Sequence, residues 1–244
     1  MAEHLGGADH LPNRRDGRPA DPRRLPRQRR GKTPQMHGRF PDHDVLGEAD
    51  HWDPVTRRVV LERVDNVPPV RFFGPAEAAT LGAFCDVVMA QDDEPRIPVL
   101  AMVDDKLHGG RLDGYRYEDM PDDRETWRRT ARGLDEAAIN RGAQEGFAQA
   151  PADMQHEICA AFAQGELSDG VWDELPVTKA WALVTRSVLA AFYSHPWAWN
   201  EIGFGGPAYP RGYSRLGVGM REAWEGAEAV DVDPVPDVVE RGLE

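Results

Sequence analysis

Two Asp-x-x-His pairs are the residues of this sequence best suited to binding a metal ion. Asp105 and His108 form one pair, and Asp153 and His156 form the other. Residues three apart on a helix share a face, so each pair could offer a carboxylate and an imidazole to one ion. Helical two-metal sites need inward-facing glutamates in addition to such pairs. We therefore expect solvated helix faces here, and keep a self-standing metalloprotein or enzyme that uses these four residues as the alternative function.

Two other short motifs resemble parts of active sites. Ser194 and His195 are a nucleophile and a base, but neighbours on a helix do not face each other, so they cannot form a dyad locally. Residues 203–208 spell the G-x-G-x-x-A of a dinucleotide-binding loop. That loop needs a strand before it and a helix directly after it, and Tyr209-Pro210 opposes the helix. We expect no catalytic, cofactor-binding or metal-binding residues in this chain.

The aromatic segment, residues 192–212, is the most informative part of the sequence. It places six aromatic side chains among prolines and glycines, whereas loops are usually small and polar. Tryptophan and tyrosine bury a large area at little entropic cost and dominate protein contacts. We expect this segment to contact a partner protein, and the alternative is that it covers its own core. The expected interface residues are Tyr193, His195, Trp197, Trp199, Asn200, Phe204, Pro207 and Tyr209.

The elements that position this segment are predicted to be helices. Apolar residues recur at spacings of three and four, as in Leu81, Phe84, Cys85 and Val88, and no convincing alternating strands accompany them. The β-branched run 59–61 would also suit a short strand. The expected fold class is all-α, an irregular bundle of five or six helices with a long aromatic Pro/Gly-rich loop. The expected helices cover about 54–65, 75–91, 98–108, 121–148, 151–164 and 176–192, with a short one near 219–228.

Composition divides the 244 residues into a basic head and an acidic remainder. Residues 1–40 hold ten Arg or Lys against four Asp or Glu, whereas the rest holds 19 against 38. An acidic folded part repels phosphate, which argues against nucleic-acid binding. We expect a disordered basic tail and linker at 1–49, a helical domain at 50–228 and an acidic extended tail at 229–244.

Four further expectations concern the compartment and the start of the protein. Cys85 and Cys159 are far apart and lie on apolar helix stripes, which predicts buried, reduced thiols. No run of about 18 apolar residues exists, so no membrane span is expected. Arg23-Arg24 is not followed by the apolar stretch of an export signal, so we expect a cytoplasmic protein, with export by a partner as the alternative. Met36 begins more ordinary sequence and is a candidate for the biological start.

Two motifs resemble the gluconate 2-dehydrogenase subunit 3 family. The first is Phe-Tyr-Ser-His-Pro at 192–196 followed by Trp-Asn-Glu-Ile-Gly-Phe-Gly-Gly-Pro at 199–207. The second is Phe-Phe-Gly-Pro-Ala-Glu-Ala-Ala-Thr-Leu at 72–81, which looks like the opening helix of the family. The resemblance covers about 50–225, most of the expected folded part.

This resemblance implies a non-catalytic accessory subunit of a hetero-oligomeric oxidoreductase complex, which binds and stabilises the large subunit or helps it to fold. The implied partner is a large flavin-dependent sugar dehydrogenase of the glucose-methanol-choline class, which would carry the FAD, and a cytochrome subunit completes some such complexes. Many family members carry a twin-arginine leader, and this chain departs from them by lacking its apolar segment. The resemblance does not identify the sugar or the electron acceptor.

Overall fold

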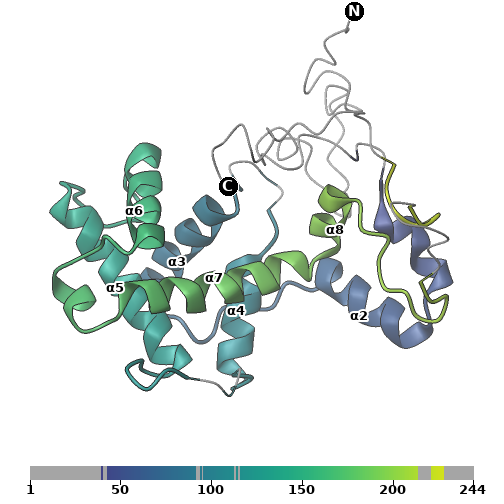
Figure 1. Ribbon diagram of the computed structural model, residues 1–244, viewed down its shortest axis with the longest axis horizontal. Coiled ribbons are helices and arrows are strands. Elements are labelled where there is room, and N and C mark those ends of the chain that lie inside the picture. Colours follow the sequence, from purple (N-terminus) through teal and green to yellow (C-terminus); the bar gives the residue numbers. More distant parts are fainter. Residues whose placement is uncertain are drawn as a thin grey trace, which may run out of the picture. The chain divides into compact units, whose positions relative to one another are not determined.

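The all-α fold class is confirmed by a computed structural model of the chain (Figure 1). Within its described residues lie seven α-helices and two short 3₁₀ helices, with no strand. The expected count of five or six helices was therefore slightly low. The contacts divide the chain into two compact units. The described residues of unit 1 are 40, 43–66, 94, 96–97, 193–213 and 221–227. The described residues of unit 2 are 67–91, 98–112, 114 and 116–192.

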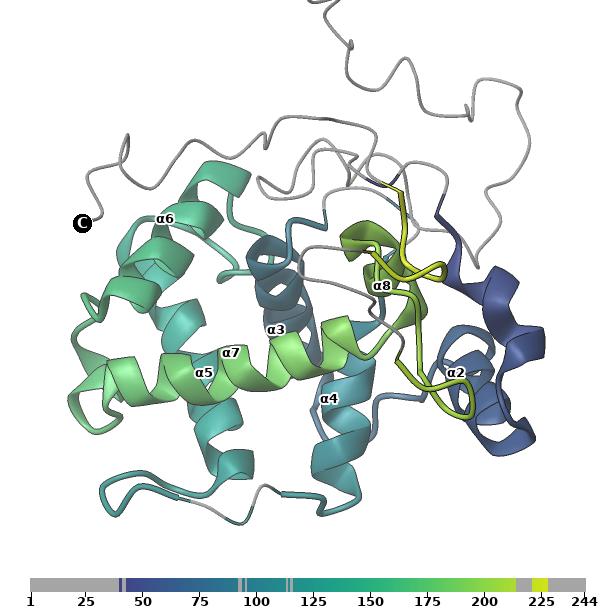
Figure 2. The same ribbon diagram turned by 45° about the vertical axis from the view of Figure 1, so that its right-hand side comes forward.

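Unit 2 is built from helices that follow one another along the chain. Helix α3 contacts α4, α5 and α6, and therefore lies at the centre of the unit. Helix α7 crosses α5, and both can be followed in Figures 1 and 2. The elements are α3 (Pro75–Val88), α4 (Val99–His108), α5 (Asp123–Asn140), α6 (Ala152–Gln164), the 3₁₀ helix η4 (Gly170–Asp173) and α7 (Val177–Tyr193), whose last residue is assigned to unit 1.

An aromatic cluster forms part of the core of unit 2. Phe162 packs with its ring centroid 4.9 Å from Trp172 and 5.2 Å from Trp181. The Trp172 indole also donates a hydrogen bond to the carbonyl of Gly133 over 3.1 Å. A Cβ at Gly133 would lie 2.5 Å from the Trp172 ring, so only glycine permits this approach. Glycine disfavours a helix by propensity, but at position 133 it is required by the close packing of Trp172 against α5.

A buried carboxylate holds the segment that leads into α3. Asp104 is fully buried and accepts hydrogen bonds from the backbone N–H groups of Arg71, Phe72 and Phe73, over 2.7–3.2 Å. Buried polar groups are expensive unless their hydrogen bonds are made, and here four such bonds satisfy the carboxylate. The Phe72-Phe73-Gly74 sequence is therefore fixed by a side chain about thirty residues away.

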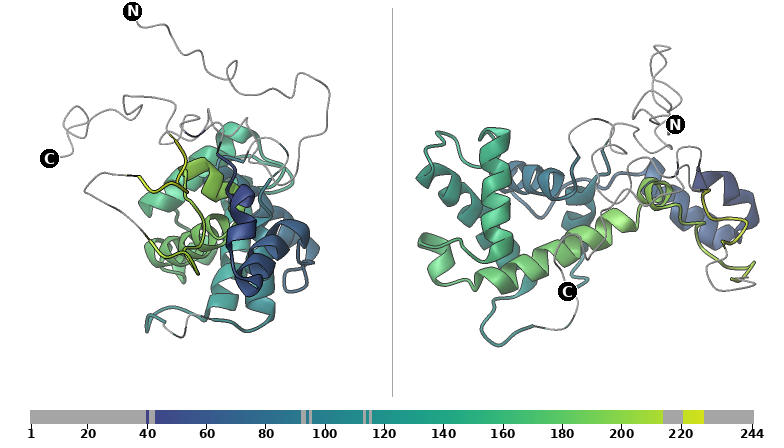
Figure 3. Two further views of the ribbon diagram at one scale, coloured as in Figure 1. Left: turned by 90° about the vertical axis from the view of Figure 1, so that its right-hand side faces the viewer. Right: turned by 45° about the horizontal axis from the view of Figure 1, so that its top comes forward.

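Unit 1 joins segments from both halves of the chain. Its helices are η3 (Val45–His51), α2 (Pro54–Asp65) and α8 (Pro196–Ile202). Helix α2 begins as expected, because the Asp53 carboxylate accepts hydrogen bonds from Val55 and Thr56 N–H and Pro54 occupies the first position. Helix α8 contacts both η3 and α2. Figure 3 shows the green and yellow C-terminal segments beside the blue N-terminal helices.

The structure corrects two expectations about the C-terminal part. The aromatic segment is not a continuous loop, because α8 forms inside it. The short helix expected near 219–228 is wrong for residues 221–227, which are described and form turns. Of the expected basic tail and linker at 1–49, only residues 40 and 43–49 are described, and Met36 and the acidic tail at 229–244 lie outside the described residues. The expected 50–228 range is divided between the two units, and η3 begins before it.

Both cysteines are buried free thiols, as predicted. Burial raises the pKa of the Cys159 thiol to about 12, and raises the pKa of Cys85 further above its ordinary value. Neither thiol is therefore ionised near neutral pH, so neither has the thiolate character that reactive cysteines need. Within the described part of the chain, no helix combines the length and the apolar character required to cross a bilayer.

Candidate functional site

Helix α8 organises the aromatic segment, and its own sequence explains where it begins and ends. His195 caps its first turn, with Nδ1 accepting a hydrogen bond from Trp197 N–H over 3.2 Å, and Pro196 follows at the first helical position. Gly203 ends the helix in the left-handed conformation, with φ of 68°. A Cβ at Gly203 would also lie 2.5 Å from the Phe40 ring. Proline at the first helical position and glycine directly after the last are therefore the sequence signals for this helix.

Trp199 is the side chain around which unit 1 packs. It is only 7 % exposed and forms an apolar cluster with Val45, Ala49, Trp52 and Val60. Its indole N–H donates to the Tyr193 carbonyl over 2.6 Å, which ties α8 to the end of α7. This tryptophan is therefore part of the core of its own unit.

An arginine supports the same tryptophan from α2. The Arg63 guanidinium lies 5.9 Å from the centroid of the Trp199 ring and donates to the Ser194 carbonyl over 2.6 Å. Burial lowers the pKa of Arg63 from its ordinary value, although an arginine in a protein remains charged. The contact links α2 to the turn between α7 and α8.

Two hydrogen bonds connect the aromatic segment to residues that precede η3 or begin it. Asn200 is 1 % exposed, and its side-chain oxygen accepts the N–H of Val45 over 2.7 Å. His43 Nε2 donates to the carbonyl of Phe204 over 3.0 Å. Both bonds bridge more than 150 residues of sequence. They fix α8 against the N-terminal part of the unit.

The chain after α8 is held by a second set of contacts. Gly226 N–H donates to the Gly203 carbonyl over 2.8 Å, and Arg211 donates to the Gly205 carbonyl over 2.8 Å. The Arg211 guanidinium also lies 3.7 Å from the buried Glu222 carboxylate and 5.0 Å from the Trp224 ring centroid. The glycine-rich residues after α8 are thus a packed connection, and they follow a helix where a dinucleotide loop would follow a strand.

The eight predicted interface residues fall into three groups by exposure. His195, Trp197, Trp199 and Asn200 are buried within this chain, and Phe204 and Pro207 are half-buried. Tyr193 and Tyr209 are 42 % and 68 % exposed. Sequence reasoning missed Tyr213, which is 69 % exposed and lies just beyond the segment. In and directly after the aromatic segment, the exposed aromatic side chains are therefore tyrosines, and the tryptophans beside them are buried.

The two Asp-His pairs lie on α4 and α6 of unit 2. Asp105 pairs with two arginines, at 2.6 Å from Arg71 and 2.5 Å from Arg111. His156 Nδ1 donates to the Ala152 carbonyl one turn earlier, over 2.7 Å. Among the residues that the structure describes, no group of three or more His, Cys, Asp or Glu side chains is placed to hold a metal ion. The pairs are therefore not gathered into one site.

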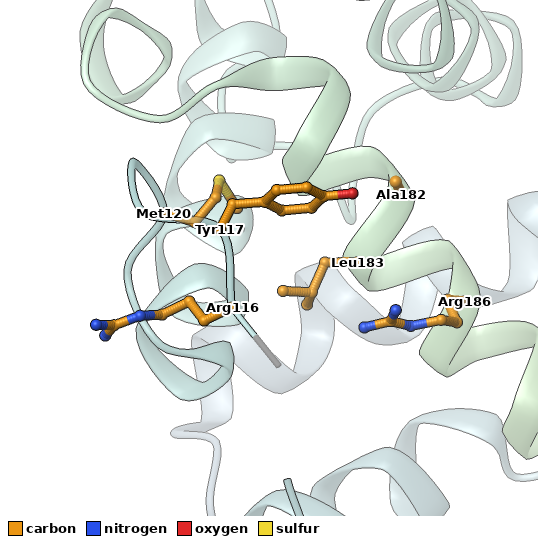
Figure 4. Close-up of a pocket in the computed structure, with 6 residues that line it drawn as sticks. All are labelled: Arg116, Tyr117, Met120, Ala182, Leu183 and Arg186. Atoms are coloured by element: carbon orange, nitrogen blue, oxygen red, sulfur yellow. The ribbon is translucent and has the colours of Figure 1, made fainter. Parts of the chain in front are cut away.

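A small pocket lies between residues 116–120 and α7 in unit 2 (Figure 4). The Tyr117 ring extends across it toward α7, and Arg116 points away from Tyr117. The interior volume of this pocket is about 40 Å³. This is room for a few water molecules, whereas cofactor pockets hold roughly 300–1,000 Å³. The pocket is lined by Arg116, Tyr117, Met120, Ala182, Leu183 and Arg186.

Comparison with known proteins gives one match, which is to a family. The family model for gluconate 2-dehydrogenase subunit 3 matches residues 75–206, more than half of the chain. The matched range begins at the first residue of α3 and ends four residues after α8, so it includes most of the aromatic segment. No curated protein and no solved structure matches the chain. The chain belongs to the gluconate 2-dehydrogenase subunit 3 family.

Proposed function

We propose that this chain is a non-catalytic small subunit that binds and stabilises a flavin-dependent sugar dehydrogenase of the glucose-methanol-choline class. The observation that carries the proposal is the family match across α3 to α8. The FAD belongs to the large subunit in this proposal, and this chain supplies contact surface only. A partner that binds only the folded large subunit raises its stability by mass action.

The exposed tyrosines of the aromatic segment are the proposed contact points. Tyr193 and Tyr209 are solvent-accessible, whereas the neighbouring tryptophans are already buried against this chain. Tyrosine combines a large apolar ring with a hydroxyl that can bond at a wet rim, which suits it to interfaces. The buried residues, among them His195 and Trp199, keep the backbone that carries these tyrosines in place.

A self-standing metalloprotein has weaker support. Such an enzyme would need the Asp105 and Asp153 pairs to share an ion, and the Asp105 carboxylate is engaged by Arg71 and Arg111 instead. A second function is therefore not proposed.

The proposal is tested by producing the large subunit with and without this chain. The large subunit should be recovered with FAD and co-purify with the full chain, and its soluble yield should fall without it. Replacing Tyr193 and Tyr209 together by serine should weaken co-purification by about tenfold or more, because aromatic anchors dominate interface energies. Tyr117→Ser is the matched control, since Tyr117 is 44 % exposed but lies in unit 2.

Two results would count against this function. A large subunit that folds, holds FAD and turns over sugar equally well alone would remove the need for a stabilising subunit. Equal loss of co-purification in Tyr117→Ser would show that the tyrosines of unit 1 are not the specific contacts.

A further inference from the structure

Four arginines of unit 2 contact either the Phe72 ring or the Asp105 carboxylate, and we call these four side chains the arginine face. Arg128 lies 4.4 Å and Arg124 5.7 Å from the Phe72 ring centroid. Arg71 precedes Phe72 in the chain, and it shares the Asp105 carboxylate with Arg111. One ring therefore gathers Arg124 and Arg128, and one carboxylate gathers Arg71 and Arg111.

Three arginines of this face are more exposed than the carboxylates that pair with them. The side chains of Arg71, Arg111 and Arg128 are 46 %, 62 % and 44 % exposed. Their acidic partners are less exposed, with Asp105 at 30 % and Glu77 at 28 %. The adjacent Asp104 is fully buried and faces backbone N–H groups. These guanidinium groups are thus accessible to carboxylates of a partner, although the chain has a net charge of −13.

The guanidinium groups are held in place before any partner binds. Phe72 is fixed by the Asp104 carboxylate through its backbone N–H and by an edge contact with Phe73, at 4.9 Å between centroids. Arg124 donates from Nε to the Leu107 carbonyl over 2.8 Å, which anchors it at the end of α4. Arginine loses less entropy per hydrogen bond when its planar group is already ordered, and stacking on an aromatic ring orders it.

The chemistry of the face selects a carboxylate-bearing partner. Guanidinium groups bind carboxylates through two parallel hydrogen bonds, and arginine is enriched in protein interfaces. A nucleic acid would bring many phosphates close to the 38 acidic residues that follow residue 40, which opposes its binding. A short acidic segment of a protein meets the arginines without that long-range repulsion, because salt screens charges beyond about 8 Å.

We infer that the arginine face binds an acidic segment of the large subunit. This inference rests on the proposed function, and it adds a second contact surface that consists of charged groups rather than tyrosines. The segment would place its carboxylates against the outward N–H groups of Arg71, Arg111 and Arg128. Such contacts give specificity and speed of association more than raw affinity, and they weaken as salt concentration rises.

The test measures binding of the full chain to the FAD-loaded large subunit at 50 mM and 300 mM NaCl. Replacing Arg111 and Arg128 together by glutamine should weaken the Kd by about tenfold at low salt and reduce its salt dependence. Arg58→Gln is the matched control, because Arg58 is exposed on α2 in unit 1, and its Kd should stay within about twofold. Circular dichroism checks that each variant keeps its helices. If the double glutamine variant fails to fold, the double lysine variant replaces it, and about threefold weaker binding is expected because lysine lacks the planar fork.

The outcomes separate this inference from the proposed function. Wild-type binding that the arginine variants leave unchanged overturns the arginine face and leaves the small-subunit function intact. Absence of wild-type binding overturns the proposed function and this inference with it. Equal weakening in Arg58→Gln shows that overall charge is responsible, which overturns the assignment of the site. Retention on duplex DNA that is lost only in the arginine variants, with flavoprotein binding unchanged, replaces the inference with a nucleic-acid surface.

Discussion

The longest-range side-chain hydrogen bonds inside unit 1 join residues much further apart in the sequence than those inside unit 2. In unit 2, the Asp135 carboxylate accepts the N–H of Phe147, 12 residues away, and Asp104 accepts the N–H of Arg71, 33 residues away. In unit 1, Asn200 accepts the N–H of Val45 from 155 residues away. Closing a loop of 155 residues costs about 2 kcal/mol more than closing one of 12. Unit 1 therefore depends on strong contacts at the point where its two segments meet.

The largest expected effect comes from removing the main contact of unit 1. Trp199→Ala should destabilise that unit by about 3–5 kcal/mol, because a buried tryptophan that packs with Val45, Trp52 and Val60 is replaced by a methyl group. Hydrogen exchange read by mass spectrometry should show lost protection in 43–66 and 193–213, with α3 to α6 much less affected. Tyr209→Ala, at an exposed position of the same unit, is the control and should stay within about 0.5 kcal/mol.

Loss of protection spread evenly over both units would contradict the claim that the stability of unit 1 depends on its own long-range contacts. It would mean that unit 1 and unit 2 unfold as one cooperative body, whatever the distances that their hydrogen bonds bridge. If unit 1 unfolds in Trp199→Ala, this variant cannot test whether Trp199 contacts a partner directly, because any interface formed by unit 1 is lost with its fold.

An intermediate effect is expected from the buried carboxylate of unit 2. Asp104→Asn should cost about 2–3 kcal/mol, because an amide offers one acceptor oxygen where the carboxylate accepts four bonds through two. Urea unfolding measures the change, and protection should fall first around residues 71–74. Asp105→Asn, one position along, should cost at most about 1 kcal/mol because its ion pairs are exposed. Similar costs at the two positions would show that the hydrogen bonds accepted by Asp104 do not hold residues 71–74 in place.

The smallest expected effect is a dependence on pH at Asp105. Hydrogen bonding from Arg111, followed by the charges of Arg111 and Arg71, lowers the pKa of this carboxyl from its ordinary 3.8. A lowered pKa in the folded state means that the ionised carboxylate stabilises the fold above pH 3.8, and that this contribution is lost as the pH falls through the folded value. The difference in unfolding free energy between wild type and Asp105→Asn should shrink from pH 5 to pH 2. A difference that stays constant over this range would rule out the ion pairs as its cause.

Local signals made unit 2 largely predictable from sequence. The predicted helices at 75–91, 98–108 and 151–164 agree with α3, α4 and α6 within about three residues at each end, because Gly74-Pro75, Gly109-Gly110 and Gly165 are local signals for helix ends. Helix α5 ends at Asn140, eight residues before its predicted end. Gly133 disfavours this helix by propensity, and the reason for a glycine there depends on Trp172, a residue far along the chain.

Unit 1 could be predicted less well, for two physical reasons. The aromatic residues of 196–202 concealed a short helix, although His195-Pro196 and Gly203 are good signals for its ends. The burial of Trp199 and Asn200 depends on residues 43–60, and no local pattern shows that segments so far apart will meet. A partner interface and an internal core both favour tryptophan, so sequence alone left these two roles open.

The joining of Val45 to Asn200 has a consequence for how the protein is made. A ribosome adds about 5–20 residues per second, so the 155 residues between these two positions take on the order of 10–30 s to synthesise. For much of that interval Val45, Trp52 and Val60 are outside the ribosome, while Trp199, which packs with them in the folded unit, has not yet been translated. The apolar side chains of the N-terminal helices are therefore exposed to water or bound by a chaperone during this time. Unit 1 is completed only after α8 leaves the exit tunnel of the ribosome.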